Sequence, residues 1–200
     1  MRVAVGGMLL LLSGSVLAAE SVGKVDLKAL TLRSAPGAEH KALQPLIGKF
    51  KVEKKLFVAM GTADKPATST GMIATREWVG DGRFLRDVIT GKVAGNAYWR
   101  EGLLGYNPSN KRYEWNTADN VTPIMMQYRS KNGSSRANPI EMSGAFTDLG
   151  VTGEENVGKP VMMRTVITVV DSDHHTFEIY FTTPEGIELL ADRMEFTRTK

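Results

Sequence analysis

From Phe50 onward the chain consists of short runs that alternate apolar and polar residues, and this pattern constrains the fold more than any other feature. The runs are rich in Val, Ile, Thr and aromatic residues, and turn-forming residues separate them. Such alternation is typical of antiparallel strands with one buried face. We expect about nine or ten strands joined by consecutive hairpins, which predicts an all-β, antiparallel up-and-down β-barrel. A β-sandwich is the alternative that the pattern leaves open.

Charge and size set the register of three hairpins. Asp81-Gly82 is a strong signal for a two-residue turn, because both positions favour positive φ. The pairs that this turn sets opposite one another are Trp78 with Leu85, Glu77 with Arg86, and Arg76 with Asp87. A loop over residues 107–110 sets Leu104 opposite Tyr113 and Gly102 opposite Trp115, where the glycine leaves room for the indole. A turn at Glu185-Gly186 pairs Phe181 with Leu190, Glu178 with Arg193, and Phe177 with Met194.

The N-terminus has the pattern of a signal peptide over residues 1–18. Arg2 precedes an apolar stretch, residues 3–12, which is too short to span a bilayer, and Val16-Leu17-Ala18 supplies the small residues of a cleavage site. We expect cleavage after Ala18, or after Ala19, and a periplasmic or secreted mature protein. Residues 19–36 form a lead-in segment that we expect to be flexible, and residues 37–200 form the barrel domain, which begins with a short helix over residues 38–47.

The composition excludes several classes of site. The chain of 200 residues contains no cysteine, which excludes disulfides, thiolate metal ligands, a catalytic thiol and a lipoprotein anchor. Its net charge of +3 is spread along the chain, so no basic stripe indicates nucleic-acid binding. No second apolar segment approaches the length of a membrane span, so we expect no span in the mature chain. The sequence does not indicate a protein partner.

Catalytic motifs are also missing from the sequence. It contains no nucleophile elbow, zinc-protease helix, phosphate loop or dinucleotide fingerprint. The carboxylates that the hairpins place, Glu77, Asp87 and Glu178, already face basic partners. A basic partner lowers the pKa of a carboxylate and makes it a poor general base. We therefore predict no catalytic residue, and we leave open whether the protein is an enzyme, with the balance against it.

Four large amphipathic residues share one side of the expected sheet, namely Tyr98, Arg100, Tyr113 and Trp115. If that side is the interior, they line a cavity, and Arg100 with Tyr98 would clamp a carboxylate or another anionic head group. Sites for small ligands are mostly apolar and contain a few convergent polar groups. The sequence thus predicts a barrel that binds a small apolar or amphipathic molecule. The alternative is a structural or partner-binding module whose interior is filled by aromatic side chains.

Four motifs carry a resemblance over residues 39–198. They are Leu46-Ile-Gly-Lys-Phe50, Gly82-Arg-Phe-Leu85, Gly102-Leu-Leu-Gly-Tyr-Asn107 with Tyr113 and Trp115 after it, and Glu195-Phe-Thr-Arg198. The chain resembles a family of exported bacterial proteins catalogued as a domain of unknown function, which is similar to the lipocalin, fatty-acid-binding and nitrobindin barrels. The resemblance implies a calycin-like barrel and no particular activity.

The resemblance also implies a contact that closes the barrel. Gly48-Lys49-Phe50 lies where such barrels usually have Gly-X-Trp, with an arginine of the last strand stacked on the ring. Here Phe50 replaces the tryptophan and Arg198 is the matching arginine. We expect the guanidinium to pack over Phe50 and to hold the first and last strands together as a cation–π contact, worth about 0.5–1 kcal/mol at an exposed site.

Histidines and methionines raise the question of metal or haem. The resemblance makes haem a hypothesis, because nitrobindin-like barrels bind haem through a histidine. However, the expected turn puts His174 and His175 at an exposed hairpin tip, and His40 lies in the short helix. Adjacent methionines at 125–126 and 162–163 suggest soft-metal ligands, but only one of each pair can point inward on a strand. We therefore predict exposed histidines, methionines that fill the core, and no metal site or cofactor; a weak metal- or haem-dependent enzyme is the third alternative.

Overall fold

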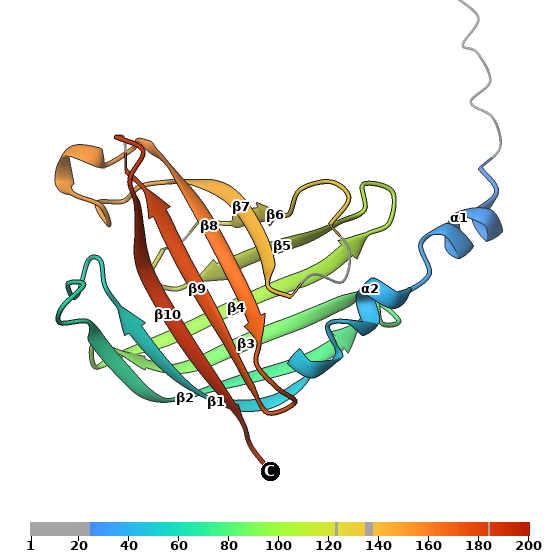
Figure 1. The fold of residues 1–200 in the computed structure, drawn as a ribbon, viewed down its shortest axis with the longest axis horizontal. Coiled ribbons are helices and arrows are strands. Elements are labelled where there is room, and N and C mark those ends of the chain that lie inside the picture. The colour runs from blue at the N-terminus through green and yellow to red at the C-terminus, as the bar shows by residue number, and fades with distance from the viewer. Residues whose placement is uncertain (1–24, 123, 135–137, 184) are drawn as a thin grey trace, which may run out of the picture.

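Ten antiparallel strands close into a barrel in the computed structural model, which describes residues 25–122, 124–134, 138–183 and 185–200 (Figure 1). The strands are β1 (Gly48–Leu56), β2 (Ala67–Val79), β3 (Phe84–Val93), β4 (Asn96–Asn107), β5 (Arg112–Asp119), β6 (Met126–Arg129), β7 (Ile140–Thr147), β8 (Pro160–Val169), β9 (His174–Thr182) and β10 (Glu188–Arg198). The helical segments are α1 (Leu27–Arg33), α2 (Ala38–Lys41) and the 3-10 turns η1 (Gln44–Leu46) and η2 (Glu154–Asn156).

Each strand pairs with its neighbours in the chain, and β1 pairs with β10 to close the sheet. That last pairing runs from Phe50 opposite Arg198 to Leu56 opposite Asp192. The prediction of an up-and-down barrel is confirmed, and the sandwich alternative is wrong. Because the sheet is closed, it leaves no unpaired edge, which suits a chain without disulfides.

The predicted register is confirmed around the β2–β3 turn. All three expected pairs are present, and the Arg76 Nε donates to Asp87 over 2.7 Å. At the β9–β10 hairpin, Glu178 faces Arg193 and Phe177 faces Met194 as expected. Phe181, however, faces Leu189 rather than Leu190, because a β-bulge shifts the register between Leu190 and Asp192.

The predicted β4–β5 register is wrong by two residues. Leu104 faces Trp115, and Gly102 faces Thr117, because the turn includes Lys111, whose φ is +51°. A shift of two keeps every side chain on its expected face. Although Gly102 does not face Trp115 directly, it makes room for the indole, because a Cβ at this position would lie 2.5 Å from the Trp115 Nε1.

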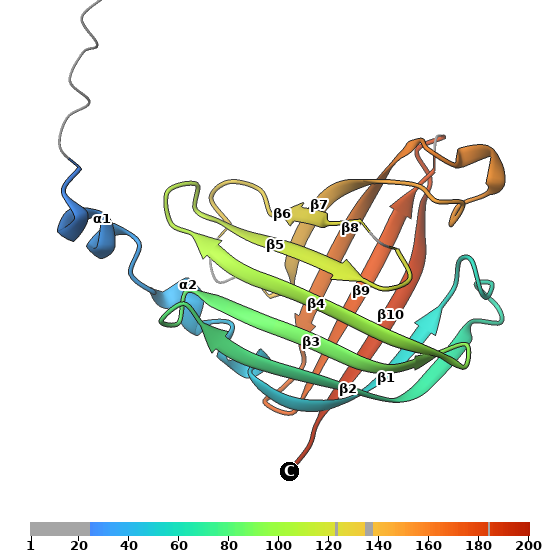
Figure 2. The same ribbon diagram turned by 180° about the vertical axis from the view of Figure 1, so that it is seen from behind.

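The segment before the barrel contains more helix than the sequence indicated. α1 lies within the lead-in and projects away from the barrel in both views (Figures 1 and 2). In place of one short helix, the structure has α2 followed by the turn η1. The predicted signal peptide, residues 1–18, lies outside the described residues. None of the helices in the described ranges has the length and apolar character that crossing a bilayer requires.

The segment from α2 to η1 closes one end of the barrel. Leu43 and Leu46 are fully or almost fully buried in the core. The hydroxyl of Tyr113 on β5 donates to the Glu39 carbonyl over 3.2 Å, and the indole of Trp78 on β2 donates to Gln44 over 3.0 Å. The other end carries the β1–β2, β3–β4, β5–β6, β7–β8 and β9–β10 connections, and an internal cavity opens here between loop residues.

Candidate functional site

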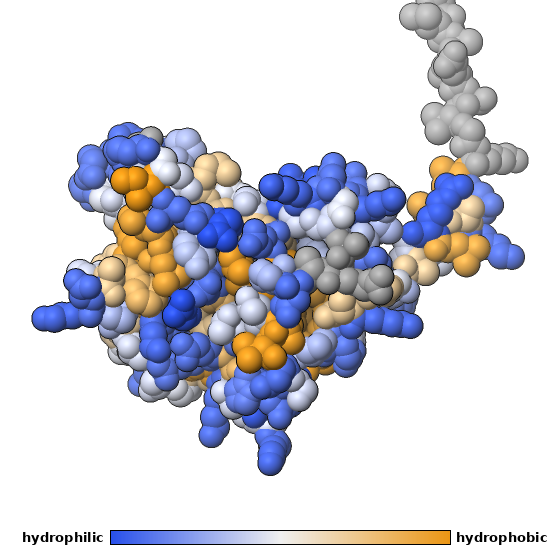
Figure 3. All heavy atoms as spheres, in the orientation of Figure 1, coloured by the Kyte–Doolittle hydropathy of each residue, from blue (hydrophilic) through white to orange (hydrophobic). Residues whose placement is uncertain are grey.

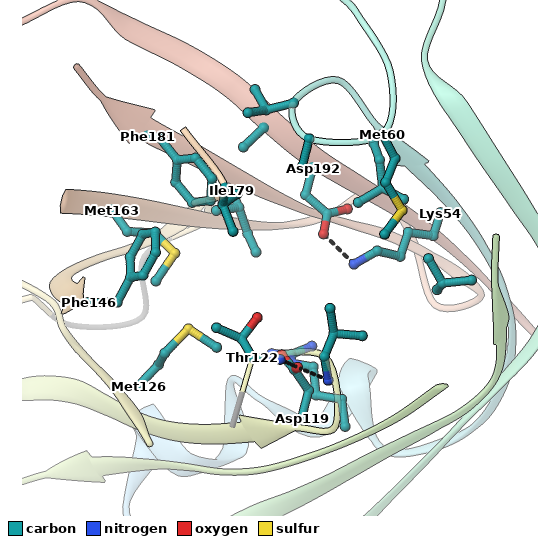
Figure 4. A pocket seen from close by; sticks show the side chains of 18 of the residues that line it. Lys54, Met60, Asp119, Thr122, Met126, Phe146, Met163, Ile179, Phe181 and Asp192 are labelled. Carbon is teal, nitrogen blue, oxygen red and sulfur yellow. Dashed lines mark hydrogen bonds and ion pairs between the residues drawn. The ribbon is translucent and has the colours of Figure 1, made fainter. Parts of the chain in front are cut away.

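A cavity of about 140 Å³ lies inside the open end of the barrel. Its described lining residues come from every strand except β2 and from the loops around the opening. The residues that line it include Lys54, Tyr98, Arg100, Asp119, Met126, Tyr128, Phe146, Met163, Phe181, Ala191 and Asp192. Figure 4 shows Met126, Phe146 and Met163 on one side of the space and the Lys54–Asp192 pair on the other. The site therefore combines an apolar wall with a charged wall.

The apolar wall is rigidly packed around Tyr128. The Tyr128 hydroxyl donates to the sulfur atoms of Met126, at 3.3 Å, and Met163, at 3.6 Å. Burial raises the pKa of Tyr128 to about 12, so this hydroxyl keeps its proton at neutral pH. Phe146 and Phe181 continue the wall, with ring centroids 5.2 Å apart. An apolar molecule of matching size would meet hydrocarbon, thioether and ring surfaces here.

The charged wall centres on an ion pair between Lys54 and Asp192. Both residues are buried, and the Lys54 ammonium donates directly to the carboxylate. Burial alone would lower the pKa of Lys54, but the Asp192 carboxylate outweighs it, so this pKa is raised and the lysine stays charged. The ammonium also lies 5.2 Å from the ring centroid of Tyr98, and burial raises the pKa of that phenol. The ion pair thus holds Lys54 in its charged form.

Arg100 lies at the inner boundary of the cavity and is 3 % exposed. Its guanidinium carbon is 4.6 Å from the Trp115 ring and 5.0 Å from the Phe177 ring. The nearest carboxylate oxygen is Oδ2 of Asp87, at 3.7 Å from the Arg100 Nη1, which is beyond hydrogen-bond distance. Neither Nη1 nor Nη2 donates a hydrogen bond to any of the residues that the structure describes. Arg100 is therefore a buried cation with free donors.

Behind Arg100, a second guanidinium is fully engaged. Arg76 donates from Nε to Asp87 and from Nη1 to the Nε2 of His175. The His175 ring stacks on Phe196, with centroids 4.4 Å apart and planes 13° apart. Burial, together with the charges of Arg76 and Arg198, lowers the pKa of His175 to about 2. This imidazole is thus neutral, and its Nε2 is already occupied as an acceptor.

The prediction of exposed histidines is wrong for two of the three. His175 is buried because adjacent residues on a strand face opposite sides, and β9 begins at His174. His40 is also buried: its Nδ1 accepts the backbone N–H of Gly37 over 3.1 Å, and burial lowers its pKa. Only His174 is exposed, and its Nδ1 lies 2.9 Å from Asp171.

The structure separates the four residues that the sequence grouped. All four are buried, but only Tyr98 and Arg100 line the cavity. Tyr113 lies toward the closed end, where its ring centroid is 5.2 Å from that of Tyr106. Trp115 packs beneath Arg100 and against Phe177, with ring centroids 5.0 Å apart. All four side chains point inward, so their position along the strand decides which of them line the cavity.

Sequence reasoning missed Lys54 and Asp192. The strand alternation contains a signal for the first, since Phe50, Val52 and Lys54 occupy every second position of β1, and the first two belong to the core. The signal for Asp192 is weaker, because the bulge before it changes which residues of β10 face inward. Lys54 and Asp192 meet only because β1 pairs with β10.

Phe50 and Arg198 meet where the barrel closes. The Arg198 guanidinium carbon lies 4.6 Å from the Phe50 ring centroid, which is within cation–π range. Its Nη1 donates to the Ile47 carbonyl over 2.7 Å, and its Nη2 donates to the Pro45 carbonyl over 2.8 Å. Gly48 makes room for this group, because a Cβ there would overlap the Arg198 Nη1. Arg198 therefore joins the last strand to the segment that closes the barrel.

The methionines divide as the strand alternation requires. Met126 and Met163 face inward, whereas Met125 and Met162 are 77 % and 52 % exposed. Both inner sulfur atoms accept the Tyr128 hydroxyl. Within the described ranges, no three His, Asp or Glu side chains come together in a way that could hold a metal ion.

A second hollow lies outside the barrel, beneath the β7–β8 loop, where hydrophobic side chains gather on the surface (Figure 3). Its walls include Met162 and Leu189, and its charged residues, among them Glu155 and Lys159, are exposed. Among its described residues, this hollow has no buried polar group that would orient a ligand. The internal cavity is the stronger candidate, because it has such groups.

The chain matches a family described as "Protein of unknown function (DUF1579)" over residues 35–198. No curated protein matches it. A solved structure described as "EF1p2_mFAP2b bound to DFHBI" is 10% identical with a TM-score of 0.43, over 81% of this chain and 100% of that one. The S-type phycobiliprotein lyase CPES from Guillardia theta is 9% identical with a TM-score of 0.47, over 85% of this chain and 97% of that one.

Proposed function

The chain belongs to this family of proteins of unknown function, and we propose that it binds a small, partly apolar molecule inside the open end of its barrel. The observation that carries the proposal is a cavity with an apolar wall of methionine and aromatic side chains and a few buried polar groups opposite. This combination is typical of sites for small ligands. The closed end leaves the side with the loops as the direction of entry.

The size of the cavity limits the ligand. Its volume of about 140 Å³ is below the roughly 300–1,000 Å³ of sites for drug-sized molecules. An engineered apolar cavity of about 150 Å³ in another protein binds benzene. The buried part of the ligand is therefore about as large as one six-membered ring or a short alkyl chain. A longer molecule would extend between the loops at the opening.

We further propose that the protein binds this ligand after export to the periplasm. The support is the signal-peptide pattern of residues 1–18 together with the absence of cysteine from all 200 residues. A closed sheet stabilises such a chain without disulfides.

Toluene is a suitable probe, because it matches the volume and carries no polar group. The methionine methyl groups report its position by NMR: toluene should shift the signals of Met126 and Met163, which line the cavity, and leave those of the exposed Met125 and Met162 unchanged. Equal shifts at all four methyl groups, or no shift at saturating toluene, would contradict binding in the cavity.

A matched pair of variants controls for binding elsewhere. Ala191 is buried and lines the cavity, so Ala191→Leu fills part of the space and should abolish the toluene shifts. Overpacking of this kind costs about 1–3 kcal/mol of stability, which a folded barrel tolerates. Ala97→Leu makes the same change at an exposed position of β4 and should leave the shifts unchanged.

A further inference from the structure

The charges buried inside the barrel do not balance. Among the residues that the structure describes, the buried cations are Lys54, Arg76 and Arg100, and the carboxylates beside them are Asp87 and Asp192. His175 adds no charge, because its Nε2 accepts from Arg76. The remaining buried carboxylate, Asp148, lies in the β7–β8 loop, where it accepts the backbone N–H groups of residues 150–152. The interior therefore holds one positive charge in excess.

The pattern of contacts assigns this excess to Arg100. Lys54 is paired with Asp192, and Arg76 holds Oδ1 of Asp87 over 2.7 Å. Arg100 has only the more distant Oδ2 of the same carboxylate, at 3.7 Å. Because Asp87 is shared between two guanidinium groups, it neutralises only one of them.

Asp119 is the one further carboxylate among the described residues of the cavity wall. It lies opposite Arg100 in the β4–β5 register and is half-buried. Its Oδ1 accepts the backbone N–H groups of Val121 and Thr122 over 2.8 and 2.6 Å. Among the described residues, the ion pairs of Arg100 include Asp87 but not Asp119. Asp119 thus holds the loop at the opening and leaves the donors of Arg100 free.

We propose that the ligand of this cavity carries a carboxylate at its buried end, which binds the guanidinium group of Arg100. The inference rests on the proposed function and adds the chemical class of the ligand. A guanidinium presents parallel N–H donors that match the two oxygens of a carboxylate. The Trp115 and Phe177 rings pack against this group and hold it in place. A carboxylate there would supply the charge that the interior lacks, and a buried charge without a partner is costly.

The rest of the ligand follows from the opposite wall. Tyr128, Met126 and Met163 offer apolar surface and no charge. The buried part of the ligand, with its carboxylate, is about as large as one ring, so the rest of a larger acid would extend toward the opening. The expected class is therefore a small monocarboxylic acid with a single ring or a short alkyl chain. The Tyr98 hydroxyl, which lines the same cavity, is a second donor for the carboxylate.

Benzoate, benzamide and toluene test the charge and the fit separately, by titration of the intact mature protein at neutral pH. Toluene binding tests the cavity alone. Benzoate should bind on the order of tenfold more tightly than benzamide, because hydrogen bonds to charged groups are the stronger ones. Equal binding of benzamide and benzoate, with toluene also bound, would overturn the carboxylate inference and leave the proposed function intact. Failure of all three to bind would remove both.

Variants at Arg100 and Asp119 test whether the preference for benzoate depends on the charge of Arg100. Arg100→Met should lower benzoate affinity by on the order of tenfold to a hundredfold and change toluene affinity little. Asp87 keeps Arg76 as its partner in this variant. Arg100→Lys, which keeps the charge but loses the fork of donors, should give an intermediate affinity and serves if the methionine variant does not fold. Asp119→Asn removes a negative charge near the site and should tighten benzoate binding several-fold. An unchanged preference for benzoate in both Arg100 variants would contradict the assignment.

Discussion

At the residue scale, His175 shows how the barrel interior controls an ionisable group. Its ring lies between Phe50 and Phe196 and accepts a hydrogen bond from a permanent cation, Arg76. A protonated imidazole at this position would lose its acceptor and face a like charge. The pKa of about 2 means that the folded protein holds His175 neutral at any physiological pH. The residue is therefore a structural acceptor.

The lowered pKa of His175 should make the stability of the protein depend on pH. In the unfolded chain a histidine titrates near pH 6.5, whereas burial, Arg76 and Arg198 lower the pKa of folded His175 to about 2. Below pH 6.5 the unfolded state binds a proton that the folded state does not. As the pH decreases below 6.5, this group should therefore lower the free energy of unfolding by about 1.4 kcal/mol for each pH unit. Denaturant titrations between pH 6.5 and 5 should show a shallower dependence for His175→Gln; identical slopes would contradict the prediction.

Gly102 is the second residue whose identity the packing dictates. An alanine Cβ would lie 2.5 Å from the Trp115 Nε1 and 3.0 Å from the Thr117 Cγ2, so the indole must move. Gly102→Ala should lower the free energy of unfolding by about 1–3 kcal/mol, as overpacking does. The neighbouring Leu103→Thr changes an exposed side chain and should stay within about 0.5 kcal/mol. Denaturant midpoints measure both, and similar values for the two variants would count against the close contact.

The sequence alone predicted the role of Gly102 correctly and the burial of His175 incorrectly. It identified Gly102 as space for Trp115, because a glycine beside a large ring is a readable pattern. It misplaced His175, because the exposure of two adjacent residues depends on where the turn ends, and a turn over residues 171–173 leaves His174 outside and His175 inside. The Arg76–His175 contact joins β2 to β9, and separate hairpins contain no information about it.

At the element scale, the alternation within each strand predicted which side chains share a face of the sheet and left open which face is the interior. The charges of Glu77, Arg86, Arg76 and Asp87 then fixed the β2–β3 register correctly. Where the register failed, the cause was an irregularity: a residue with positive φ in the β4–β5 turn, and a bulge in β10. Each irregularity shifts the strand pairing by one or two residues, and the hydrophobic pattern of the sequence does not reveal either shift. The bulge also brings Asp192 to Lys54, so it contributes directly to the site.

The closure of β1 against β10 gives a prediction at this scale. Arg198→Met removes three hydrogen bonds from a charged group, to the Pro45, Ile47 and Ser172 carbonyls. It also removes an ion pair with Asp173 and the contact with Phe50. We expect a loss of about 2–4 kcal/mol in the free energy of unfolding, since bonds to charged groups contribute about 1.5–3 kcal/mol each.

Arg193→Met is the matched control for this prediction. It removes a partly exposed arginine of the same strand, whose partner is Glu178, and should cost about 0–1 kcal/mol. Chemical denaturation of both variants makes the comparison. Equal losses would show that Arg198 has no special role in closing the barrel.

At the scale of the whole molecule, the two ends of the barrel differ: one is filled, and the other contains the cavity that we propose as a binding site. The segment from α2 to η1 fills one end, where Tyr113, Trp78 and Arg198 hold it. The other end keeps a cavity whose polar groups are buried and not all satisfied. Natural cores rarely leave a buried cation without full hydrogen bonding. This departure from a filled core is the reason to regard the open end as functional.

The proposed export gives a prediction for the intact cell. If residues 1–18 are a signal peptide, the protein recovered from a bacterial periplasmic fraction should begin at Ala19, or at Glu20 if cleavage follows Ala19. Intact-mass measurement of the protein from each cell fraction decides this. A chain that retains residues 1–18 in the cytoplasmic fraction would contradict export. The ligand would then have to come from the cytoplasm.

The central claim is that this barrel holds a small molecule, and native mass spectrometry of the protein purified from cells tests it most directly. The wild-type protein should carry an added mass that is lost on denaturation and that the Ala191→Leu variant lacks. A released species that weighs as much as a small monocarboxylic acid, and that is reduced in Arg100→Met, would support the account in full. A clean ligand-free mass for the wild-type protein under all purification conditions would contradict it.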